Sequence, residues 1–176
     1  MQTIRTFAPP TALALALVAG VALLPALSAA ADAPAPAPVD GIRCDQMEGA
    51  VFHIHQHLAI FDHGKAVLVP SDIGRPVAAG CLYWLHTHTN DGIIHVESPA
   101  FKTFTLGQLF DIWGQPLTAT NVAGVKVPKG QIRVYVNGAQ YKGDPRKIEL
   151  AQHTDIAIEA GSPFHDPQAF SDWQGQ

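Results

Sequence analysis

The sequence is poor in charge. Lys, Arg, Asp and Glu make up 15% of its 176 residues, with 11 basic against 15 acidic side chains. It contains no basic cluster, which argues against a nucleic-acid partner, because such partners need Lys and Arg to neutralise phosphates. The low charge excludes a coiled coil, and a hydrophobic content of 47% excludes an intrinsically disordered chain. We therefore expect a globular protein.

Long apolar runs are also scarce. The longest covers residues 12–27, is interrupted by Gly20 and Pro25, and is short for a membrane span of roughly 20 residues. Arg5 precedes this run and small residues follow it. That order is typical of a secretory signal peptide, which we predict over residues 1–31 in preference to an uncleaved anchor.

Export sets the predicted organisation of the rest of the chain. A Pro- and Ala-rich linker is expected over residues 32–40, followed by a single domain over residues 41–176. We expect the protein in the periplasm or secreted, with no stable membrane insertion after the signal is cleaved. The segment after Gly161 keeps three aromatic residues and is expected to pack back onto the domain.

Cysteine is limited to Cys44 and Cys81. In an oxidising compartment they can form a disulfide of only one connectivity. The alternative is a thiolate metal ligand, which is less favoured because neither cysteine lies in the CxxC spacing typical of such sites.

Periodicity predicts an α+β fold with a mostly antiparallel sheet, and a β-grasp-like arrangement is our specific candidate. Apolar residues three and four apart over residues 103–113 indicate one short amphipathic helix that ends at Gly114. The turn signals, above all Asn137-Gly138, indicate hairpins. The predicted strands are residues 52–61, 66–69, 81–88, 93–97, 131–136, 139–141 and 155–160.

The abundant residue is histidine, with nine copies. His53, His55 and His57 alternate along one predicted strand, so their side chains share a face. His63, His153 and His165 fall in turns and in the C-terminal tail. We expect these last three on the surface.

The hairpin over residues 81–98 carries the other candidates. Asp91-Gly92 favours a two-residue turn, which would place His88 opposite His95 and His86 opposite Glu97. All four side chains would then share one face. A three-residue turn would send His95 and Glu97 to the opposite face.

Histidines on neighbouring strands can converge on one ion, since cross-strand neighbours lie about 5 Å apart at Cβ and metal–nitrogen bonds are about 2.0–2.1 Å long. Nitrogen ligands with one carboxylate suit Zn(II), Cu(II), Ni(II) or Fe(II), and we expect copper or zinc, because copper heads the affinity order for such ligands. We expect about one ion per chain and an affinity that falls steeply below about pH 6, because protons compete for imidazole nitrogen. The candidate metal ligands are His53, His55, His57, His86, His88, His95 and Glu97.

Three stretches, residues 53–61, 85–99 and 104–114, resemble a family of exported, His-rich bacterial and archaeal proteins with HxHxH and WLHTHxxxGIIHxESP motifs. The resemblance covers about Gly41 to Gly161. It implies one exported folding unit and supplies no reaction.

Three functions follow from these patterns. The first is copper or zinc homeostasis or delivery, with a metal-exchange protein as partner. The second is a metalloenzyme in which His86, His88 and His95 hold the ion, and Glu97 is the candidate base, with a histidine of residues 53–57 as the alternative. Such an enzyme would act in hydration or hydrolysis with zinc and in oxygen or superoxide chemistry with copper. The third is a ligand- or protein-binding module with a structural metal. No serine nucleophile elbow, phosphate-binding loop or zincin helix motif is present.

Overall fold

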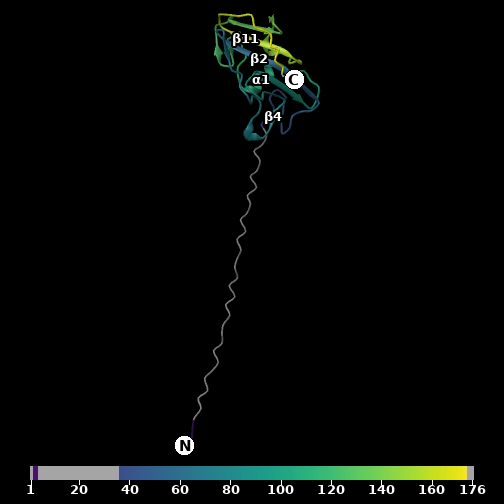
Figure 1. The fold of residues 1–176 in the computed structure, drawn as a ribbon, viewed down its shortest axis with the longest axis vertical. Coiled ribbons are helices and arrows are strands. Elements are labelled where there is room, and N and C mark those ends of the chain that lie inside the picture. The colour runs from purple at the N-terminus through teal and green to yellow at the C-terminus, as the bar shows by residue number, and fades with distance from the viewer. Residues whose placement is uncertain (1, 4–35, 174–176) are drawn as a thin grey trace. The chain divides into compact units, whose positions relative to one another are not determined.

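The computed structural model describes residues 2–3 and 36–173, and Figure 1 shows how the elements of residues 36–173 are arranged. Except for residues 2 and 3, the predicted signal peptide lies outside the described residues. The packed part includes the end of the predicted linker, because Tyr83 donates a hydrogen bond to the Ala37 carbonyl (2.8 Å) and Val39 pairs with Ile42. Within the described part, no helix is long and apolar enough to cross a membrane.

One mixed sheet of seven strands forms the centre of the fold. Its order is β10-β9-β11-β2-β6-β5, and β3 pairs with β2 outside this path. Strand β11 runs parallel to β2, and the other pairs are antiparallel. The predicted α+β class with a mostly antiparallel sheet is confirmed, and the β-grasp-like arrangement stays a prediction. The strands are β2 (Phe52–Asp62), β3 (Lys65–Val67), β5 (Leu85–His86), β6 (Ile93–Ser98), β9 (Ile132–Val136), β10 (Ala139–Tyr141) and β11 (Thr154–Ala160).

Smaller elements connect these strands. In the described part of the chain, two short antiparallel pairs lie outside the main sheet, and two 3-10 turns interrupt the loops. These elements are β1 (Cys44–Asp45) with β4 (Leu82–Tyr83), β7 (Asn121–Val122) with β8 (Val125–Lys126), η1 (Val77–Ala79) and η2 (Pro145–Lys147).

The predicted helix is α1 (Leu106–Trp113). It begins after Thr105, where Thr105 and Gln108 form a capping box, and it ends at Gly114 in the left-handed region (φ 70°). Leu106, Leu109 and Phe110 of the apolar stripe are fully buried and belong to the same core as Leu58 and Ile156 of the sheet, and Trp113 packs against that core partly buried. One face of the sheet therefore packs on the apolar core.

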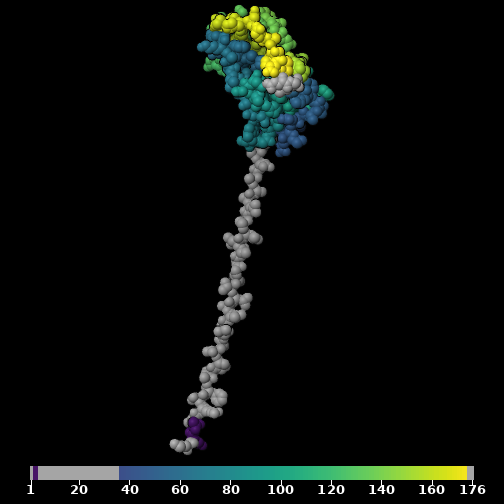
Figure 2. All heavy atoms as spheres, viewed as in Figure 1, coloured from purple at the N-terminus to yellow at the C-terminus, as the bar shows by residue number. Residues whose placement is uncertain are grey.

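The opposite face of the sheet is polar. Residues that are paired across strands share a face, and the register pairs His55 with His95 and His57 with Asp155. Glu159 lies further along β11 on this same face. Part of this face is covered by the C-terminal tail, where Phe170 stacks on His57 with ring centroids 3.8 Å apart. The tail, yellow in Figure 2, packs back onto the domain as expected.

The predicted register of the histidine hairpin is wrong. His86 pairs with His95, where the sequence predicted that His88 would pair with His95 and His86 with Glu97. The connection runs over residues 87–92 and is not the predicted two-residue turn. Because the pairing is displaced by two positions, an even number, every side chain stays on its predicted face.

Bonds to a distant loop explain the longer connection. The Thr87 amide donates to the Ile73 carbonyl (3.1 Å), and its hydroxyl donates to the Pro70 carbonyl (2.8 Å). Thr87 therefore pairs with the loop before β4 instead of with β6. The other end of the connection, just before β6, is bonded to β2 instead, because the Leu58 amide donates to the Gly92 carbonyl (2.9 Å).

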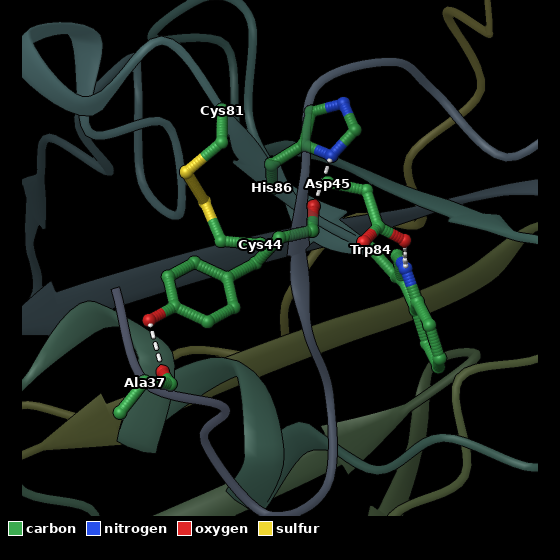
Figure 3. Close-up of a disulfide and its surroundings, with 7 residues drawn as sticks. Ala37, Cys44, Asp45, Cys81, Trp84 and His86 are labelled. Atoms are coloured by element: carbon green, nitrogen blue, oxygen red, sulfur yellow. Dashed lines mark hydrogen bonds between the residues drawn. A yellow bond between two sulfur atoms is a disulfide. The ribbon is translucent and has the colours of Figure 1, made fainter. Parts of the chain in front are cut away.

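The predicted disulfide between Cys44 and Cys81 is present, with the two Cα atoms 5.4 Å apart. Figure 3 shows that it lies beside the β1–β4 pair, in which Cys44 is the partner of Tyr83. The predicted strand over residues 81–88 is therefore divided: its first part, β4, pairs with β1, and its second part, β5, joins the main sheet.

Gly74 offers a direct test of how tightly the loop before β4 packs on β5. Its φ is +71°, and a Cβ there would collide with the Leu85 carbonyl oxygen. Gly114 has nearly the same φ (+70°) but open space around it. We expect Gly114→Ala to cost about 1–2 kcal/mol from backbone strain alone, and Gly74→Ala to cost clearly more in urea unfolding. Equal losses for the two variants would contradict this packing.

Candidate metal centre

The polar face of the sheet gathers six of the seven predicted ligands. Strand β6 lies between β2 and β5 in the sheet, so its side chains are flanked by histidines on both sides. The six residues are His53 and His55 from β2, His95 and Glu97 from β6, His86 from β5, and His88 from the loop after it.

The Glu97 carboxylate lies at the centre of the cluster. Its Oε1 atom is 3.1 Å from His53 Nε2 and 3.3 Å from His95 Nδ1. The same oxygen is 3.9 Å from His86 Nε2 and 4.0 Å from His88 Nε2. The Glu97 side chain is 3% exposed, and no described residue makes a hydrogen bond to its Oε2 atom. A buried carboxylate oxygen without a partner is costly, and a bound cation would satisfy it.

Two overlapping groups have the geometry of a metal site. His86, His88, His95 and Glu97 form the first group, and His53, His55 and His95 form the second. In each group the ligand atoms lie within 4.8 Å of one another. These clusters are geometrically able to bind a metal ion.

The imidazole pairs have the spacing of chelating ligands. His53 Nε2 and His55 Nε2 are 2.9 Å apart, and His86 Nε2 and His88 Nε2 are 3.1 Å apart. Two nitrogens bonded to one ion at about 2.0–2.1 Å lie about 3 Å apart. Each His-x-His pair can therefore hold one ion with little rearrangement.

A backbone carbonyl fixes the orientation of His86. The Tyr83 carbonyl oxygen can only accept, so His86 Nδ1 carries the proton and donates to it (2.9 Å, Figure 3). The lone pair of Nε2 is then directed into the cluster, as for most metal-binding histidines, whose second nitrogen is held by a hydrogen bond. The disulfide-linked strand β4 thus positions one ligand.

Electrostatics keep these ligands in their metal-binding forms. Burial lowers the pKa of His86 to about 4, and burial followed by the charges of His95 and His53 lowers the pKa of His55 to about 4. Burial also lowers the pKa of His88. Burial raises the pKa of Glu97, but the polar contact with His95 and the charges of its other histidine neighbours outweigh it and lower that pKa. Near neutral pH, His55, His86 and His88 are therefore neutral imidazoles and Glu97 is an ionised carboxylate.

The structure does not bring His57 into the cluster. Its Nδ1 atom lies 2.9 Å from Asp155 Oδ1, and its ring stacks on Phe170. Burial raises the pKa of Asp155, but the contact with His57 and a hydrogen bond from the Phe170 amide outweigh it and lower that pKa. His57 therefore belongs to a contact between the sheet and the tail.

Sequence reasoning missed Glu48, whose Oε1 lies 3.7 Å from His88 Nε2. Its chain position gives no signal, because Glu48 comes close only once β1 is paired with β4. His63, His153 and His165 are exposed, as expected.

Comparison of the chain with protein-family models, with curated proteins and with solved structures finds no match. The resemblance to an exported family therefore stays a prediction.

Proposed function

We propose that this protein is exported and binds a copper or zinc ion at the histidine cluster, in metal homeostasis or delivery. The observation that supports the proposal most is the convergence of four imidazoles on one buried carboxylate, Glu97, with a fifth imidazole, that of His55, packed against His95. Without a cation, these ring nitrogens would crowd one another around Oε1, while the second carboxylate oxygen, Oε2, is buried with no hydrogen-bond partner among the described residues.

The ligand chemistry supports copper or zinc. The first group offers three imidazoles and one carboxylate, a set that suits Zn(II) and Cu(II), and Cu(II) heads the affinity order for such ligands. The disulfide between Cys44 and Cys81 removes both thiolates from the donor set. The ion would therefore be held without the sulfur that soft Cu(I) prefers.

The amino-terminal pattern supports export, and so does the disulfide, because disulfides persist in oxidising compartments. Delivery is supported by the partial exposure of the cluster. The side chains of His53 and His88 are 50% and 31% exposed. A chelating side chain of a partner protein could reach the ion from that side, which is what transfer between proteins requires.

The same opening supports the alternative, a metalloenzyme. An ion held by His86, His88 and His95 and facing solvent can keep a water molecule. The ionised Glu97 beside it is the candidate base. Turnover of a substrate, with the metal retained through the reaction, would favour this alternative over delivery.

The decisive experiment measures metal in untagged protein purified from the periplasm of the expressing cell. We expect bound copper or zinc, and a melting temperature that rises as the ion is titrated, because binding to the folded state adds about 2.7 kcal/mol at 100 times Kd. His88→Ala should lose most of the tightly bound metal and most of the thermal shift.

His153→Ala is the matched control, because His153 is exposed and lies outside both groups. That variant should keep the metal and the thermal shift of the parent. Equal metal content in the His88 variant and the parent would contradict the assignment of the site.

A further inference from the structure

The cluster is arranged in two halves around β6. On the β2 side, the His55 ring is 4.5 Å from the His95 ring at 90°, and the His53 ring is 6.1 Å away. On the β5 side, the His88 ring is 4.3 Å from the His95 ring at 87°, and the His86 ring is 5.6 Å away. Each side therefore offers one near, edge-on imidazole and one more distant one.

A single ion does not use this arrangement fully. The first group already supplies four donors, which is the usual number for zinc. The His53–His55 pair would then remain outside, although its two Nε2 atoms have chelate spacing (2.9 Å). Its neighbour is Glu97, whose Oε1 atom is 3.1 Å from His53 Nε2.

We propose that the cluster holds a second divalent ion, bound by His53 and His55, and that the Glu97 carboxylate lies between the two ions. This inference rests on the proposed function of the first group. Glu97 suits the bridging position because its Oε1 atom already faces both sides, 3.1 Å from His53 Nε2 on β2 and 3.9 Å from His86 Nε2 on β5. Paired ions in such sites lie about 3.5–4 Å apart. The negative charge of Glu97 would also reduce the repulsion between two cations at that separation.

The two sites should differ in affinity. The first group is mostly buried and brings four donors, whereas His53 in the second is exposed. The first equivalent of metal should therefore fill the β5 side, and the second equivalent should fill the β2 side more weakly.

The test is a titration of the folded mature chain with Cu(II), followed by metal analysis and electron paramagnetic resonance. We expect about two ions per chain. The first equivalent should give the spectrum of an isolated Cu(II), and the second should broaden or diminish that signal and add a half-field transition, because the two spins lie close together.

His53→Ala should lower the stoichiometry to about one ion and restore the isolated spectrum. This variant changes a half-exposed side chain, and its thermal melt without metal should match that of the parent. His63→Ala is the matched control, because His63 is exposed and contacts Asp62 in a turn. It should bind about two ions.

The outcomes separate the two proposals. One ion per chain in the parent overturns the second ion and leaves the proposed function standing. Two ions with independent, unbroadened spectra overturn the shared carboxylate. No stoichiometric binding at all overturns the proposed function together with this inference.

Discussion

Replacing both Cys44 and Cys81 with serine is expected to lower the free energy of unfolding by about 4 kcal/mol. The two cysteines are separated by 37 positions, and the estimate is the loop entropy that their bond removes from the unfolded chain. For a domain of this size the melting temperature should fall by on the order of 10 °C. Urea unfolding of the metal-free protein measures the change.

The reduced parent protein provides the control. Its stability should fall to that of the double serine variant, and the variant itself should not respond to reductant. We also expect metal affinity to drop by about tenfold or more, because β4 carries the Tyr83 carbonyl that orients His86. If reductant does not change the free energy of unfolding of the parent protein, the prediction is contradicted.

The metal-free protein is expected to lose several kcal/mol of stability as the pH falls from about 6.5 to about 4. The pKa of His55 and of His86 is about 4 in the folded protein, against 6.5 for an unperturbed histidine. Between these values the unfolded chain binds more protons than the folded one, so acid favours unfolding. Each unit of pKa difference corresponds to about 1.4 kcal/mol.

Glu97 acts in the same direction at lower pH. Its pKa is lowered in the folded protein from 4.5, so its contribution is present above that value and is lost as the pH falls below it. Urea midpoints measured from pH 7 to pH 4 test the profile. His86→Gln should flatten it, whereas replacement of the exposed His63 should not. An unchanged midpoint over this range would rule out burial of neutral imidazoles.

The same pKa values revise the pH at which metal should be released. From ordinary histidines, the sequence predicted a steep loss of affinity below about pH 6. Because His55 and His86 stay neutral well below that pH, protons compete with the ion at these two positions only in more acidic solution.

The faces of the strands were predictable from the sequence, whereas the register was not. Alternation of residues decides which side chains share a face, and an even displacement of the pairing preserves it. The register depended on Thr87, which bonds to the Pro70 and Ile73 carbonyls. Nothing near Thr87 in the sequence identifies that loop as its partner.

The membership of the cluster shows the same limit. His53, His55 and His57 form one regular pattern in the sequence. His57 nevertheless contacts Asp155, which is 98 positions away in the chain, and not the cluster. Glu48 approaches the cluster through the β1–β4 pair. Which side chains join the cluster therefore depends on which strands become neighbours in the fold. Here β11 pairs with β2, and this pairing places Asp155 beside His57.

The location of the ligands in the central sheet has a consequence for the energetics of loading. His95 lies on β6 between β2 and β5, and His55 lies on β2, where its amide donates to Gln152 Oε1 and its carbonyl accepts from the His153 amide. These imidazoles are therefore preorganised before any ion arrives, unlike those of a zinc finger, which folds around its metal. Little conformational entropy is lost on coordination, so the binding free energy goes into affinity instead of into ordering the chain.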